Sequence, residues 1–255
     1  MREPEPAVPM GAPEESTGDG LVQVAYLHPH IVSHCWHESV TALLLHDLDH
    51  DGRIVRSGGP IMVSCPTGGL VQARNSVMRQ WLDETDHEWL WWIDTDMGFR
   101  PDTVDRLLAA ADPATRPVVG ALAYSAREIG PDGYGGRHIT AVPTMYQVAT
   151  DPQGRTGFAP VADVPPDTLV PVAGTGSACI LIHRYVAEAI RRRHGDSWYD
   201  PIRYQDGRWV SEDLSFCRRV ADASAPVHVH TGILATHHKQ VWIGAPPPAA
   251  PRPGP

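Results

Sequence analysis

Apolar residues in the first half of the chain follow two alternating patterns: short continuous runs, and longer segments with an apolar position every three or four residues. Continuous runs are typical of buried strands, and the wider spacing is typical of helices with one buried face. Helices are therefore expected over residues 40–48, after Gly69, and from Pro101, where the missing N–H of proline costs nothing. Strands are expected at residues 21–27, 61–65, 88–93 and 118–122.

The second half of the chain has glycine-rich and turn-forming stretches between extended segments. Residues 129–137 are glycine-rich, and residues 151–154 are typical of a turn between two strands. Strand residues at 169–182 are interrupted by Gly174-Thr175-Gly176-Ser177, and helices are expected near residues 185–193 and 212–221. We expect an α/β fold with a mostly parallel central sheet, helices on both of its faces, and a hairpin-rich second half.

The composition is that of one domain with two tails. A chain of 255 residues with 42% hydrophobic residues can bury one sizeable core. Residues 1–20 are rich in Pro, Glu and Gly, and residues 245–255 are nearly all Pro and Ala, so both are expected to be disordered. The folded body is expected at residues 21–244.

Charge and cysteine content exclude several classes of protein. The formal net charge is −9 and no basic run is longer than Arg191-Arg192-Arg193, which disfavours nucleic acid as a partner. No stretch of about eighteen apolar residues and no basic start before an apolar run is present, so neither a membrane span nor an export signal is expected. The four cysteines form no C-x-x-C pair, which argues against a zinc knuckle. The expected location is the cytoplasm.

Two carboxylates, Asp94 and Asp96, follow the apolar run at residues 89–93. In open α/β sheets, ligands bind beyond the carboxyl ends of the strands. Side chains alternate along an extended chain, so both aspartates are expected to point the same way, as oxygen ligands for Mg²⁺ or Mn²⁺. The alternative is a simple turn, because aspartates commonly close strands and cap the next helix.

Arg74 is the charged member of a helical stripe that is otherwise Val71, Met78 and Trp81. An unpaired buried guanidinium is costly, so Arg74 is expected to have an anionic partner. That partner is either a carboxylate of the protein or a bound diphosphate, and the sequence leaves both open.

Four motifs, in order along residues 21–240, resemble nucleotide-sugar glycosyltransferases of the GT-A fold, in the family 2-like superfamily. Ile93-Asp94-Thr95-Asp96-Met97-Gly98-Phe99 is similar to their D-x-D segment, and Ala73-Arg74-Asn75 resembles the helix that faces the donor diphosphate. Gly174-Thr175-Gly176 resembles the acceptor-side loop. Ser211-Glu212-Asp213-Leu214-Ser215-Phe216-Cys217-Arg218-Arg219 resembles the x-E-D helix.

The resemblance implies a UDP- or GDP-sugar donor and a divalent cation, Mn²⁺ or Mg²⁺, held by Asp94, Asp96 and a late histidine. His237 stands where that histidine is expected, with His238 as the competitor. Glu212 or Asp213 would serve the acceptor hydroxyl as a base or an anchor, although helix capping also explains an acidic first turn. The expected donor contacts are Tyr26, His28, Arg74, Asn75, Asp94, Thr95, Gly174, Thr175 and Gly176.

The expected reaction is sugar transfer to a hydroxyl of a protein, a glycan or a small molecule. The Arg-Asn pair and the late histidine are more similar to retaining members, so retention of the anomeric configuration is expected. Two alternatives stay open. His28 and His30 could join Asp94 and Asp96 in a metal-dependent phosphoester hydrolase, and the chain could bind sugar nucleotides without turnover.

Overall fold

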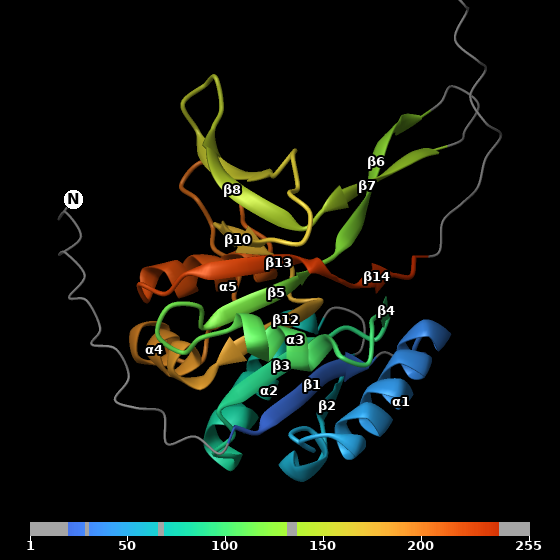
Figure 1. Ribbon diagram of the computed structural model, residues 1–255. Coiled ribbons are helices and arrows are strands. Elements are labelled where there is room, and N and C mark those ends of the chain that lie inside the picture. Colours follow the sequence, from blue (N-terminus) through green and yellow to red (C-terminus); the bar gives the residue numbers. More distant parts are fainter. Residues whose placement is uncertain (1–19, 29–30, 66–68, 132–136, 240–255) are drawn as a thin grey trace, which may run out of the picture.

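A seven-stranded sheet forms the centre of the protein in the computed structural model, which describes residues 20–28, 31–65, 69–131 and 137–239 (Figure 1). Apart from Gly20, the two expected tails at residues 1–20 and 245–255 lie outside the described residues. The strand order is β10-β13-β5-β12-β3-β1-β2. The strands are β1 (Val22–His28), β2 (Ile61–Ser64), β3 (Trp89–Ile93), β5 (Val118–Leu122), β10 (Leu169–Val172), β12 (Cys179–His183) and β13 (Val227–Leu234).

The sheet is mixed, which corrects the expectation of mostly parallel pairing. β1 is parallel to β2 and β3, and β13 is parallel to β5. β12, however, is antiparallel to both β3 and β5, and β10 is antiparallel to β13. Parallel neighbours need a crossover connection, and β12 follows hairpins rather than a helix, so it enters in the opposite direction. The strands β1, β2, β3, β5 and β13 still end at one edge of the sheet, and the candidate site lies there.

Helices cover both faces of the sheet, as expected (Figure 1). Trp91 and Trp92 are both fully buried, and they face opposite layers because side chains alternate along β3. Trp91 packs with the layer that contains α1 and α3, and Trp92 packs with the layer that contains α2, α4 and α5. The helices are α1 (His34–Asp49), α2 (Leu70–Glu84), α3 (Thr103–Ala110), α4 (Arg184–His194) and α5 (Glu212–Asp222).

Helix α1 is less buried than its apolar spacing predicts. Leu43 is 2% exposed, whereas Leu44 is 39% and Leu48 is 60% exposed. A buried carboxylate completes the packing of this helix, because Asp47 accepts hydrogen bonds from the backbone N–H of Ile54 at 3.1 Å. The helix is therefore anchored by one narrow stripe and by this polar contact with the connection to β2.

Short strands complete the fold and confirm a hairpin-rich second half. The hairpins β6–β7 and β8–β9 extend beyond the central sheet (Figure 1), and β11 pairs with β8. The two-residue strand β4 pairs with β14. These elements are β4 (Met97–Gly98), β6 (Tyr124–Pro131), β7 (Arg137–Pro143), β8 (Met145–Thr150), β9 (Thr156–Pro160), β11 (Gly174–Thr175), β14 (Thr236–His237) and the 3₁₀ helix η1 (Val55–Ser57). Among the described helices, none has the length and apolar character needed to cross a membrane.

Candidate functional site

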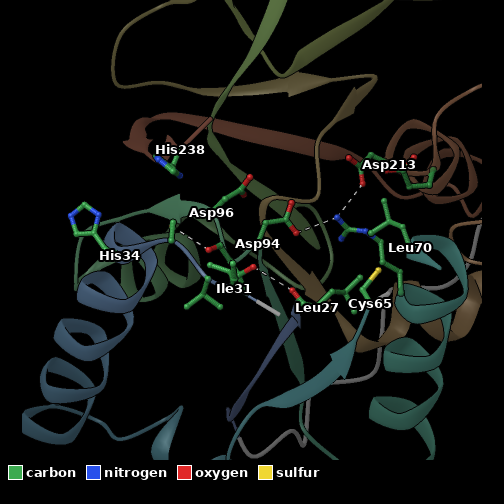
Figure 2. A pocket seen from close by; sticks show the side chains of 14 residues that line it. Leu27, Ile31, His34, Cys65, Leu70, Asp94, Asp96, Asp213 and His238 are labelled. Carbon is green, nitrogen blue, oxygen red and sulfur yellow. Dashed lines mark hydrogen bonds and ion pairs between the residues drawn. The ribbon is translucent and has the colours of Figure 1, made fainter. Parts of the chain in front are cut away.

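A cavity of about 690 Å³ opens at the edge of the sheet where β1 and β3 end (Figure 2). One part of its wall is the turn after β3, and another is the first turn of α5. Three of the four sequence motifs therefore meet at this cavity, in the position where open α/β sheets bind ligands. The charged residues of these motifs that line it are Arg74, Asp94, Asp96, Glu212 and Asp213.

Arg74 of α2 is paired with carboxylates of the protein. Its side chain is 3% exposed, and its Nη2 lies 3.3 Å from Asp94 Oδ1 and 3.9 Å from Asp213 Oδ1, the contacts dashed in Figure 2. The rings of Trp92 and Tyr199 lie 5.0 Å and 5.3 Å from the guanidinium carbon, within cation–π range. Burial opposes the charge of Arg74, but Asp94 and Asp213 outweigh it and raise its pKa above the ordinary value.

The two aspartates of the D-x-D segment have different partners within the protein, although both line the cavity. The extended chain ends at Ile93, and a turn follows in which Met97 N–H donates to Asp94 O at 3.1 Å. The alternation of side chains is lost in this turn. Asp94 faces Arg74, and burial raises the pKa of Asp94 although the charge of Arg74 opposes this.

The Asp96 carboxylate lies against His237 and Lys239. Its Oδ2 is 3.1 Å from His237 Nε2 and 2.7 Å from Lys239 Nζ. Partial burial opposes the charge of Asp96, but the hydrogen bonds from His237 and Lys239 outweigh it and lower the pKa of Asp96 to about 2. The same hydrogen bond raises the pKa of His237. The backbone N–H of His238 donates to Asp96 O at 2.8 Å, and His238 lines the cavity. His237 lines a second cavity, and its ring is the one that meets the Asp96 carboxylate.

The pairing of β4 with β14 brings His237 to Asp96 across the long sequence distance between them. His237 stands opposite Met97, and Thr236 stands opposite Gly98. A Cβ at Gly98 would lie 2.6 Å from Thr236 Oγ1, which is closer than such contacts allow. Gly98 is therefore required for the close approach of the two strands.

Glu212 and Asp213 occupy the first turn of α5, as expected from the sequence. Ser211 stands at the N-cap position, but its side chain makes no capping hydrogen bond. Burial and the neighbouring charge of Asp213 raise the pKa of Glu212. Asp213 Oδ1 is buried and makes no hydrogen bond to the described residues, although Arg74 lies within ion-pair distance. The two acids therefore differ in environment, although they are adjacent in sequence.

Several expected donor contacts lie away from the described lining of the cavity. Strand β1 contributes Leu27 to that lining, and neither Tyr26 nor His28 belongs to it. Tyr26 packs edge-on against Trp36 at 4.9 Å between ring centres. Asn75 donates to Asp200 Oδ1 at 2.7 Å and accepts from Tyr199 N at 2.9 Å, so its amide holds the loop after α4.

The remaining expected donor contacts are Thr95 and the loop Gly174-Thr175-Gly176, and both lie against the backbone of other segments. Thr95 lines the cavity, but its side chain is turned towards the carbonyl of Leu27, at 3.5 Å. Gly174 and Thr175 form β11, and the Thr175 hydroxyl donates to Thr144 O at 2.7 Å. A Cβ at Gly176 would lie 3.8 Å from Asp213 Oδ2, in ordinary contact. The glycine-rich loop therefore lies beside the carboxylate of Asp213.

Asp96 and His237 are the side chains that fit a divalent cation. Within the described residues, no three His, Cys, Asp or Glu side chains form a metal-binding group, and Asp94 is paired with Arg74 instead. Mg²⁺ is commonly bound by one or two carboxylates together with substrate phosphates and water. The Asp96 carboxylate already carries a cationic group, the Lys239 ammonium, beside the His237 ring. A cation bound here would have to displace Lys239, and Asp96 and His237 would then supply two of its ligands, with the others from a diphosphate and water.

The ligand set of the hydrolase alternative is not assembled in the described part of the chain. His28 belongs to no metal-binding group there, and His30 lies outside the described residues.

The comparisons with known proteins show a likeness in fold. No family model and no curated protein matches the chain. The crystal structure of GalNAc-T7 with UDP, GalNAc and Mn²⁺ aligns over 90% of this chain and 45% of that chain, with a TM-score of 0.53 and 12% identity. The crystal structure of A197 from STIV aligns over 86% of each chain, with a TM-score of 0.46 and 15% identity. The GalNAc-T7 likeness shows that the fold is similar to that of a GT-A glycosyltransferase.

Two contributors to the site were missed by the sequence analysis. Ser33 N donates to Thr95 O at 2.9 Å and so ties the D-x-D turn to the start of α1. Its position before a helix, where its hydroxyl accepts from Trp36 N, was a capping signal that the sequence offered. Lys239 was also missed, and its signal is that the sequence has no other lysine.

Proposed function

We propose that this protein transfers a sugar from a nucleoside diphosphate sugar to an acceptor hydroxyl, in a reaction that requires a divalent cation. The observation that carries the proposal is the cavity at the strand ends, which is lined by Asp96, the partner of His237, and by Arg74 with Asp94 and Asp213. The likeness in fold to GalNAc-T7, which was solved with UDP and Mn²⁺, supports it.

The charges around the cavity support the need for a cation. Four carboxylates belong to its described lining, and Arg74 is the only arginine among the described lining residues. A diphosphate entering alone would be repelled, because the carboxylates outnumber the positive groups. A cation held by Asp96 and His237 would neutralise the diphosphate and withdraw charge from it as it leaves. Arg74 would hold Asp94 and Asp213 in place and add fixed positive charge to the floor of the site.

On the acceptor side, we assign different roles to the two acids of α5. Glu212 has a raised pKa and lines the cavity, which suits a group that accepts a proton from a hydroxyl. Asp213 is held by Arg74, which suits an anchor that orients the acceptor. If Glu212 were a base placed for in-line attack, the configuration would invert. If the two acids only anchor the acceptor, the retention that the sequence resemblance implies is expected, and NMR of the first-formed anomer distinguishes the two.

The first experiment is a melting-temperature panel with UDP-, GDP-, dTDP- and ADP-sugars, each with Mn²⁺, Mg²⁺ or EDTA. We expect stabilisation by sugars of one nucleotide, only with metal, since ligands stabilise the folded state that binds them. Stabilisation by none of them would overturn the proposal. Nucleotide release with an acceptor or with water then separates an enzyme from a module that binds without turnover.

The variant that tests the cation assignment is Asp96→Ala. It should lose the metal-dependent part of donor binding and stay folded, because a partly exposed carboxylate beyond a strand end contributes little to packing. Asp105→Ala is the matched control, since Asp105 pairs with His46 on α1 and does not belong to the described cavity lining. Unchanged metal-dependent binding in Asp96→Ala would contradict the assignment. His28→Ala tests the hydrolase alternative, because only that alternative requires His28 for metal binding.

A further inference from the structure

Lys239 is the only lysine in the chain. The sequence has 21 Lys and Arg residues in total, and all the others are arginines. This one ammonium lies 2.7 Å from Asp96 Oδ2, on the same oxygen that His237 approaches at 3.1 Å. The one position with lysine instead of arginine is therefore beside Asp96, the carboxylate that is best placed to bind a cation.

Arginine and lysine differ in how firmly they hold a carboxylate. Arg100 binds Asp102 through two parallel contacts, of 3.0 Å and 3.3 Å. Lysine carries a single compact charge on a flexible stem, so it can change partners without breaking a two-point contact. The Lys239 side chain is 44% exposed and Asp96 is 34% exposed. Exposed pairs of this kind contribute little to stability, so their dissociation costs little.

The position of Lys239 also conflicts with a bound cation. A cation bound by both Asp96 and His237 would lie at Oδ2, because the His237 ring approaches that oxygen, and two positive charges at one oxygen repel each other. When a divalent cation binds Asp96, the ammonium has to leave, and the nearest new anion would be the phosphates that complete the coordination of the cation.

We propose that Lys239 exchanges between Asp96 and the diphosphate of the donor, so that it competes with the cation in the empty site and binds the diphosphate in the loaded one. This rests on the proposed function in one respect, namely that a ligand with a diphosphate occupies the cavity. The exchange couples the two ligands, because a cation gains affinity once the displaced ammonium has an anion to bind. By linkage, the diphosphate gains affinity from the cation by the same factor.

The first test measures Mn²⁺ binding without any nucleotide, by the EPR signal of free Mn²⁺, in the wild type and in Lys239→Met. Methionine keeps the length of the side chain and removes the charge. We expect Lys239→Met to bind Mn²⁺ roughly threefold to tenfold more tightly, the range that the loss of a competing, partly exposed charge allows. Arg100→Met is the matched control, since it removes one positive charge from a pair outside the described lining and should leave the affinity unchanged. Equal or weaker Mn²⁺ binding in Lys239→Met would overturn the proposal.

The second test measures pyrophosphate binding at saturating Mn²⁺ by calorimetry. Lys239→Met should bind pyrophosphate roughly tenfold more weakly than the wild type, because one charge-assisted contact is lost. The combination of tighter metal binding and weaker diphosphate binding is the signature of exchange. Lys239→Arg should recover part of the diphosphate affinity but bind Mn²⁺ no more tightly than the wild type, since its fork stays on Asp96. Undiminished pyrophosphate binding in Lys239→Met would refute the exchange.

The single lysine also allows the exchange to be observed directly. In protein labelled with ¹³C at lysine Cε, one side-chain signal should move when Mg²⁺ is added and move again when pyrophosphate follows. A signal that ignores either addition would contradict the exchange. Neither probe contains a base or a sugar, so the result is independent of the donor. If Lys239 showed the exchange but no nucleotide sugar stabilised the protein, the proposed function would be refuted and this inference would stand.

Discussion

Asp94 and Asp96 both line the cavity, and their contacts with a cationic side chain are built in opposite ways. Arg74 is 3% exposed and lies between Asp94 and Asp213, with aromatic rings beside it. Lys239 is 44% exposed and meets Asp96 at the rim. A buried pair is expensive to break because the partner left behind is a buried charge without a counter-charge or water. The members of an exposed pair are solvated by water when they separate. We call Arg74 with Asp94 and Asp213 the fixed part of the site, and Asp96 with His237 and Lys239 the exchangeable part.

The two aspartates of the D-x-D turn belong to different parts of the site. Asp94 belongs to the fixed part, and Asp96 belongs to the exchangeable part. The turn after Ile93 aims them at different partners, so one aspartate holds the floor while the other is available to a ligand. Substitutions that act on one part should therefore leave the other unaffected.

The largest effect is expected for Arg74→Leu, which removes the cation from the fixed part. Asp94 and Asp213 would lose their common partner, and we expect a loss of about 2 to 4 kcal/mol in the free energy of unfolding. Urea denaturation measures it, as a lower midpoint with an unchanged slope. Arg79→Leu on the same helix is the matched control. Arg79 is 53% exposed and pairs with Asp196 at 3.3 Å, so its loss should stay within about 0.5 kcal/mol. Equal losses in the two variants would remove the distinction between the parts.

The next effect concerns the strand pair that positions the exchangeable part. In Gly98→Ala the new Cβ would meet Thr236 Oγ1 at 2.6 Å, and such overpacking typically costs about 1 to 3 kcal/mol. If β14 moves away, His237 leaves Asp96. The pKa of the His237 imidazole, measured by NMR, should then fall toward its ordinary value of 6.5.

The double variant Gly98→Ala/Thr236→Ala is the control for that interpretation. It removes the hydroxyl that the new Cβ would strike, so it should recover most of the stability and of the raised pKa of His237. A double variant as unstable as Gly98→Ala alone would show that the strand pair is not what positions the histidine.

A smaller effect is expected for Asp96→Asn in the presence of EDTA. The pKa of Asp96 is lowered from 3.8 to about 2, so its pairing stabilises the protein above pH 4 and is lost as the pH falls through 2. Because both partners are partly exposed, the loss at pH 7 should be about 1 kcal/mol or less. The difference between wild type and variant should shrink below pH 4. A loss as large as that of Arg74→Leu would place Asp96 in the fixed part.

The sequence predicted much of the fold because its signals are local. The apolar run that ends at Ile93 and the run at residues 118–122 became strands almost at the expected bounds, and Ser211 marked the start of α5. The antiparallel direction of β12 was not predicted, because it depends on how the hairpins before it return to the sheet, which no local spacing reports.

The candidate site was predictable in its members and less so in their contacts. Asp96 and His237 were expected together, and the structure brings them within 3.1 Å. Arg74 was expected to need an anion, but only tertiary packing identifies Asp94 and Asp213 as its partners. Asn75 followed the family motif in sequence, while its amide is used to hold a loop.

The smallest effect is expected for Glu212→Gln, and its sign is opposite to the others. Burial raises the pKa of Glu212 from 4.5, so the folded state binds its proton more tightly and stability falls as the pH rises through that raised pKa. Glutamine carries no such cost, so the variant should be about 0.3 to 0.8 kcal/mol more stable at pH 7, with no gain at pH 4. Glu188→Gln, which weakens a partly exposed pair with Arg184, should instead lose a few tenths of a kcal/mol. A Glu212→Gln variant that loses stability would show that this acid stabilises the fixed part, whereas a gain would mean that its charge is kept at a cost to folding.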